Sequence, residues 1–145
     1  MKNLNVNPII FAMANPEPEI RPELAKKIRP DCIIATGRSD YPNQINNVMC
    51  FPFLFRATLD VRASQINEKM KMAAAKALAA IAKMPIPIEV KNAYPNRSFE
   101  FGREYIIPTP FDPRLIENIC IEVAKAAEES GIAKNPIKDY DNYRK

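Results

Sequence analysis

The strongest constraint on the fold of this chain is a pattern of two short apolar runs with one amphipathic stretch between them. The runs cover residues 8–14 and 32–36, and neither alternates apolar with polar residues, which is typical of strands buried on both faces. Between them, residues 19–29 place Leu24 and Ile28 four positions apart among charged residues, the spacing of a short amphipathic helix. This order predicts two parallel strands joined by a right-handed helical crossover.

The predicted crossover decides where polar side chains gather. The carboxyl ends of parallel strands open on the same edge of the sheet, where ligands bind in open α/β folds. Asn15 follows the first strand, and the loop at 37–47 follows the second. That loop carries four further side-chain amides, Asn43, Gln44, Asn46 and Asn47. Amides donate and accept hydrogen bonds without charge, so the pattern predicts a site that orients a ligand with carboxylates, hydroxyls or a carboxamide. Capping of turns and helix ends is the alternative use of these side chains.

The composition excludes several kinds of catalytic site. The chain has no histidine, which removes Ser-His-Asp and Cys-His catalysis and a histidine zinc site. Its three glycines are too far apart to form a glycine-rich phosphate cradle.

Two roles of Arg38 stay open, because it can bind a carboxylate or phosphate in bidentate fashion or form an ion pair with Asp40. We therefore expect neither a catalytic group nor a metal site in this chain.

Composition also limits the partners and the compartment. The net charge is +4, and the basic residues are interleaved with acids, so no nucleic-acid surface is expected. No apolar run approaches the roughly 20 residues that span a bilayer, and no signal peptide precedes the first strand. The three widely spaced cysteines, Cys32, Cys50 and Cys120, indicate small buried side chains in a reducing compartment. We expect a cytoplasmic protein without a membrane partner.

The middle of the chain is predicted to be helical. Residues 48–58 are apolar and aromatic, and they indicate a buried helical segment that is bent or split near Pro52. Ser64 is the predicted N-cap of a helix that runs to about Lys83.

The last third begins with an extended connection. Five prolines lie between residues 85 and 110, and the predicted packing points of this connection are Ile86, Ile88, Tyr105 and Ile107. Asp112 and Pro113 predict the start of a helix that ends at Gly131. The polar tail from residue 134 is expected to be loose.

Together these elements predict an α/β chain, a partial Rossmann-like doubly wound domain with parallel strands and additional C-terminal helices. The predicted division is a C-terminal half of the dinucleotide-binding domain over residues 1–62, closing helices with the proline-rich connection over 63–133, and a tail over 134–145. Two strands rarely make an independently stable sheet. We therefore expect further sequence, another subunit or a rearranged local fold to complete it.

Four stretches of the chain resemble the bacterial NAD(P)-dependent malic enzymes. They are PIIFAMANPEPE at 8–19, IIATGRSDYPNQINN at 33–47, FPFLFR at 51–56 and YIIPTPFDPRL at 105–115, and GRSDYPNQ is the most specific part. The chain differs from the family pattern at Cys50 and Ala57, where glycine is common, and at Thr109, where lysine is common.

The resemblance implies the C-terminal half of the family's NAD(P)-binding domain. It implies NAD or NADP as cofactor, Mg²⁺ or Mn²⁺ held by ligands outside this chain, and oxidative decarboxylation of malate to pyruvate. By motif position, Asn15, Asn46 and Asn47 are implied to bind the substrate, and Asn15 and Asn46 to contact the nicotinamide end of the cofactor.

The family's catalytic Tyr and Lys, its acidic metal ligands and its glycine-rich loop have no corresponding positions here. The resemblance therefore implies a fragment that is inactive alone, that depends on a missing N-terminal catalytic region and that belongs to a homo-oligomer. Two alternatives stay open. One is a non-catalytic interaction domain that completes its sheet with another subunit or a separate N-terminal half. The other is a dehydrogenase-like fold that acts on another hydroxy acid.

Overall fold

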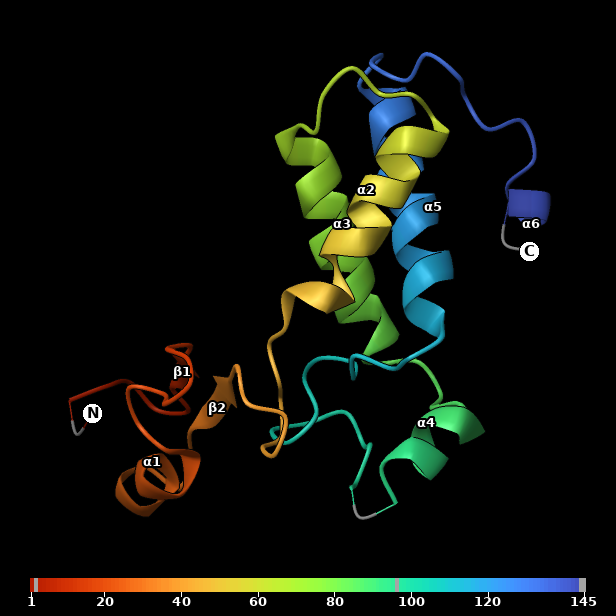
Figure 1. Ribbon diagram of the computed structural model, residues 1–145. Helices are drawn as coiled ribbons and strands as arrows, with labels where there is room; N and C mark the ends of the chain where they lie inside the picture. The colour runs from red at the N-terminus through yellow and green to blue at the C-terminus, as the bar shows by residue number, and fades with distance from the viewer. Residues whose placement is uncertain (2, 96, 144–145) are drawn as a thin grey trace.

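A small βαβ unit and a helical bundle make up most of the fold, as Figure 1 shows. The computed structural model describes residues 1, 3–95 and 97–143. The βαβ unit consists of β1 (Ile9–Ala12), α1 (Pro22–Ile28) and β2 (Ile33–Thr36). The bundle consists of α2 (Phe51–Asp60), α3 (Glu68–Ile81) and α5 (Arg114–Glu129). Three shorter helices are η1 (Asn47–Met49), α4 (Ile88–Ala93) and α6 (Tyr140–Tyr143).

The βαβ unit has the predicted order and direction. β1 and β2 are parallel, with Ile9 opposite Ile33 and Ala12 opposite Thr36. Ala25 of α1 is buried in a small cluster with Cys32 and Ile34. The predicted α/β class is thereby confirmed, and the carboxyl ends of the two strands lie side by side.

The predicted burial holds for β2, whose residues Ile34, Ala35 and Thr36 are buried, and is wrong for β1 and α1. Ile9 and Phe11 of β1 are 65% and 58% exposed, and Leu24 and Ile28 of α1 are also exposed. The helix turns Ala25 toward the sheet instead of the predicted pair. Successive side chains of a strand point to opposite faces, so Ile9 and Phe11 share one face, and no element of the described residues covers that face.

The helical bundle contains the larger core. Contacts between α3 and α5 and between α2 and α5 dominate the packing of the chain. The largest side chains fully buried in this core are Met49, Val61, Met70, Ile81, Leu115, Ile119 and Val123. The core therefore depends on three helices, and the two strands contribute little to it.

The helix starts differ in part from the predictions. The split near Pro52 is confirmed, because η1 ends at Met49 and α2 begins at Phe51, with the proline in the first turn of α2. The expected burial of this segment is wrong for Val48, Phe51 and Phe55, which are exposed. Asn67, not Ser64, is the N-cap of α3, because its side chain accepts a 3.0 Å hydrogen bond from the Met70 amide.

The proline-rich connection is not wholly extended. It contains α4, which starts after Pro87 and was missed because prolines so close together favour extended backbone. Tyr105 is buried as predicted, whereas Ile88 is exposed. Gly131 ends the long helix region with a φ of 68°, a left-handed conformation that glycine adopts easily.

The C-terminal tail is docked on the bundle up to residue 143, so the predicted loose tail is wrong. The Asn135 amide donates to the Val61 carbonyl at 3.0 Å. The Tyr140 hydroxyl donates to Glu128 at 2.9 Å, and the Tyr143 hydroxyl donates to Asp60 at 2.7 Å. These bonds attach the tail to the C-terminal ends of both α2 and α5.

The tail contacts are expected to weaken at alkaline pH. Burial and the hydrogen bond to Asp60 raise the pKa of Tyr143, and burial and Glu128 raise the pKa of Tyr140. An unfolded tyrosine loses its proton near pH 10, while these two keep theirs, so the unfolded state binds fewer protons. The free energy of unfolding should therefore fall as the pH rises above about 10.

Urea unfolding at about pH 8 and pH 11 checks this expectation. The variant Tyr140→Phe/Tyr143→Phe should lose less stability between the two pH values than the parent chain. Comparison of the two chains cancels the titration of the lysines. Equal losses would contradict the proposed role of the two tyrosines.

All three cysteines are free thiols; Cys32 and Cys120 are buried and Cys50 is half-buried. Cys50 has a φ of −127° and Ala57 lies inside α2, so neither departure from the family pattern occupies a left-handed backbone position. Within the described part of the chain, no helix is both long and apolar enough to cross a membrane.

Candidate functional site

The loops that follow β1 and β2 lie together at the carboxyl edge of the sheet. A Cβ atom placed on Gly37 would be 4.0 Å from the carbonyl oxygens of both Met13 and Ile45. The backbone just before Asn15 and the backbone just before Asn46 therefore flank the same glycine.

An ion pair also joins the two loops. Arg38 Nη1 lies 3.2 Å from Glu17 Oε1, and Glu17 follows Asn15 by two residues. The βαβ topology thus brings together the backbone segments that carry the predicted site.

The three predicted site residues, Asn15, Asn46 and Asn47, are exposed at this edge. Asn46 Oδ1 accepts a 3.0 Å hydrogen bond from the Val48 amide and so caps η1. This bond leaves the two Nδ2 donors of Asn46 for a ligand. Asn47 is the first residue of η1, and a cis peptide bond joins Asn15 to Pro16.

Two other loop amides have structural roles, so the alternative use of these side chains holds for them. Asn43 is buried and donates to the carbonyls of Ile34 and Arg103 at 3.1 and 2.7 Å. Its Oδ1 accepts from the Ile106 amide at 2.9 Å. Gln44 donates to the Gly37 carbonyl at 3.3 Å. The sequence predicted that five side-chain amides converge on one ligand. This prediction is wrong for Asn43 and Gln44, which bond to the protein instead.

Arg38 forms an ion pair with Asp40, one of the two roles that the sequence left open for it. Its Nε and Nη2 donate to the two carboxylate oxygens of Asp40 at 2.9 and 2.8 Å. These hydrogen bonds raise the pKa of Arg38 and lower the pKa of Asp40. Because the third guanidinium nitrogen, Nη1, donates to Glu17 Oε1, the guanidinium is largely committed within the protein, and the arrangement shapes the loop.

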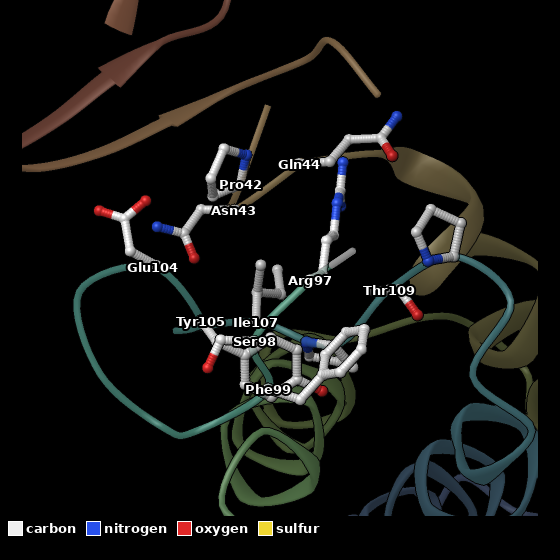
Figure 2. A pocket seen from close by; sticks show the side chains of 12 residues that line it. Pro42, Asn43, Gln44, Arg97, Ser98, Phe99, Glu104, Tyr105, Ile107 and Thr109 are labelled. Carbon is white, nitrogen blue, oxygen red and sulfur yellow. The ribbon is translucent and has the colours of Figure 1, made fainter. Parts of the chain in front are cut away.

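A small pocket lies beneath the loop, shown in Figure 2. Its volume is about 20 Å³, which is room for about one water molecule and too little for an organic acid. Thr109 lines this pocket, and its buried hydroxyl has no hydrogen-bond partner among the described residues. The pocket is therefore no substrate site, and the candidate site is the exposed edge above it.

Sequence reasoning missed the support that residues 97–106 give to the site loop. Arg97 Nη2 donates to the carbonyls of Ser39 and Tyr41 at 2.6 and 3.2 Å, and Asn43 bonds to the same stretch of chain from the other side. No local pattern reveals these pairs, because each joins residues more than fifty positions apart.

The chemistry available at this edge is binding and orientation. Exposed carboxamides present neutral donors and acceptors. Among the described residues there is no group of three or more Asp, Glu, Cys or His side chains that could hold a metal ion. The described residues therefore do not make a metal site by themselves.

Parallel strands, a helical crossover and polar loops at the carboxyl edge define a piece of a dinucleotide-binding α/β fold of the Rossmann type. Residues 1–98 match the family described as malic enzyme, NAD binding domain. The chain belongs to this family, as the motifs at the two strand ends suggested.

Similar proteins agree with this membership. The chain is 59% identical to the NADP-dependent malic enzyme of Escherichia coli over 143 residues, which are 99% of this chain and 19% of the relative. It is 54% identical to an NAD-dependent malic enzyme of Rhizobium meliloti over 94% of this chain and 18% of the relative. The chain thus spans about a fifth of the length of these curated relatives.

Solved structures give the same result for the fold. The malic enzyme from Pyrococcus horikoshii matches with a TM-score of 0.81 and 41% identity, over 99% of this chain and 29% of that one. The malic enzyme of Entamoeba histolytica matches with a TM-score of 0.82 and 33% identity, over 99% and 26%. These values confirm the α/β fold and the family membership.

Proposed function

We propose that this chain forms the substrate- and nicotinamide-orienting part of a malic enzyme, which oxidises and decarboxylates malate to pyruvate. The observation that carries the proposal is the meeting of the Asn15 loop and the Asn46 loop at one sheet edge, in a chain of the malic enzyme family. In this proposal residues 1–62 belong to the dinucleotide-binding domain.

The asparagines have a defined role in this proposal. Nδ2 of Asn46 points to a ligand as a donor because Oδ1 is held by η1, so it suits a carboxylate or hydroxyl oxygen of malate. Asn15 and Asn47, whose side chains have no hydrogen bond to the described residues, offer both donors and an acceptor to malate, and Asn15 also to the nicotinamide carboxamide. The nicotinamide, when bound, accepts the hydride from C2 of malate.

Proton transfer and metal binding are proposed to come from groups that this chain does not supply. Its described residues contain no metal-ligand cluster, and the whole sequence has no histidine. Mg²⁺ or Mn²⁺ and the phosphates of NAD or NADP are held elsewhere in the proposed enzyme. The chain alone should accordingly show no malate turnover.

A chimeric enzyme tests the proposal. In it, this chain replaces the 143 matched residues of the Escherichia coli NADP-dependent malic enzyme. We expect the chimera to reduce NADP with malate and Mn²⁺, and the isolated chain not to do so. A folded chimera without activity, or malate turnover by the isolated chain, would count against the proposal.

A second candidate function rests on the exposed strand β1. Ile9 and Phe11 form an uncovered apolar face beside a strand edge with no partner among the described residues, a surface that pairs readily with another chain. A non-catalytic interaction domain, or a homo-oligomer, would use this face. Sedimentation of the isolated chain discriminates, because a strictly monomeric, folded chain would count against self-pairing.

A further inference from the structure

Asn43 connects the site loop to two other parts of the molecule. Its side chain is buried, with 5% of the residue exposed, and Figure 2 shows it pointing from the loop toward the segment of Glu104 and Tyr105. Three hydrogen bonds of 2.7 to 3.1 Å join it to Ile34 of β2 and to the backbone of Arg103 and Ile106. A buried amide with this many bonds is costly to displace.

The backbone at Asn43 also favours this residue type. Its φ is 54°, in the left-handed region that asparagine tolerates better than most non-glycine residues. The loop can therefore reverse direction at Asn43 while the side chain turns inward. An alanine would lose both properties.

From Asn43 onward, successive residues are tied down as far as the predicted site. Gln44 is bridged to Thr36 of β2, and the Ile45 amide donates to the Thr36 carbonyl at 2.8 Å. Asn46 then caps η1. Backbone or side-chain hydrogen bonds hold Gln44, Ile45 and Asn46 in turn. We therefore expect a displacement of Asn43 to displace the side chains of Asn46 and Asn47 as well.

We propose that Asn43 is a positioning residue, whose three buried hydrogen bonds to β2 and to residues 103–106 fix where Asn46 and Asn47 stand at the substrate edge. The inference rests on the proposed function for its effect on malate. It also gives a role at the site to residues 103–106, which lie outside the matched stretch 1–98.

Asn43→Gly in the chimeric enzyme tests the proposal, because glycine keeps the left-handed backbone and removes all three side-chain bonds. We expect the KM for malate to rise about 10- to 100-fold, the effect of small misplacements of orienting groups. Asn67→Ala is the control, since it also removes an asparagine that bonds to backbone, at the α3 cap and outside the site loop. The control should leave the KM for malate unchanged.

Asn43→Asp provides a second variant of the same size. It keeps an acceptor for the Ile106 amide but loses the donors to Ile34 and Arg103. We expect a KM at least as high as that of Asn43→Gly, because the new carboxylate would face the carbonyl oxygens of Ile34 and Arg103 with no proton to donate. This variant keeps the size of the buried side chain, so a rise in KM that both variants share is assigned to the lost hydrogen bonds and not to the volume removed in Asn43→Gly.

A measurement without turnover separates this inference from the proposed function. In NMR spectra of the isolated chain, Asn43→Gly or Asn43→Asp should shift the side-chain amide resonances of Asn46 and Asn47, and Asn67→Ala should not. If the parent chimera is inactive but these resonances shift, the positioning role stands and the proposed function fails. Unchanged amide resonances in both Asn43 variants, or an unchanged KM in an active chimera, would overturn the inference.

Discussion

Asn15→Ala in the chimeric enzyme is expected to lower kcat/KM for malate by about 10- to 100-fold. A hydrogen bond to a charged group contributes about 1.5–3 kcal/mol, and each 1.4 kcal/mol corresponds to about a tenfold change in rate. Asn15 is exposed at the sheet edge, so the substitution removes the proposed ligand contact and leaves no buried group unpaired. Initial rates at varied malate and NADP concentrations measure the effect.

Asn92→Ala is the control for this prediction. Asn92 is an exposed asparagine on α4 and lies outside the two loops that form the candidate site. Its replacement should leave kcat/KM within about twofold of the parent, as expected of a surface substitution. A loss at Asn92 as large as that at Asn15, or no loss at Asn15, would refute the assignment of Asn15 to the site.

The sequence determined the topology around the site because that information is local. Two apolar runs and the helix between them lie within residues 8–36, and the rule for parallel crossovers then places both loops at one edge. The end of the long helix at Gly131 was predictable for the same reason, since one residue type suits the left-handed backbone there.

The errors occurred where the environment is set by distant residues. Leu24 and Ile28 have helical spacing, yet α1 turns Ala25 inward against Cys32 and Ile34 and leaves the other two exposed. A periodic pattern identifies an apolar face, but it does not say whether this chain covers that face.

The candidate site was predictable only in part for the same reason. Asn15, Asn43 and Asn46 are identical side chains in polar loops, and only the structure distinguishes the buried Asn43 from the exposed pair. Its partners at Arg103 and Ile106 lie some sixty residues away along the chain. The family motif marked the loop, and the long-range contacts divided its amides into supporting and exposed ones.

Arg114→Met is expected to cause the largest loss of stability, about 3–5 kcal/mol, the usual cost of leaving one member of a buried ion pair without its partner. The Asp112 side chain is fully buried and that of Arg114 is 13% exposed. Arg114 Nε donates to Asp112 Oδ1 at 2.9 Å. Its Nη1 donates to the Pro85 carbonyl at 2.9 Å, so the pair holds the start of α5 against the chain that leaves α3.

Urea unfolding of three variants separates the buried charge from the loss of an arginine in general. Arg21→Met removes an ion pair with Glu17 in which both side chains are 57% exposed, and it should cost no more than about 1 kcal/mol. Asp112→Asn/Arg114→Met should recover part of the loss caused by Arg114→Met, because no charge is then buried alone. If the double variant is less stable than Arg114→Met, or if Arg21→Met costs as much, the uncompensated carboxylate is not the cause. A loss in Arg114→Met that the double variant partly restores would show that the buried pair secures the start of α5, where the 97–113 segment that supports the site loop is anchored.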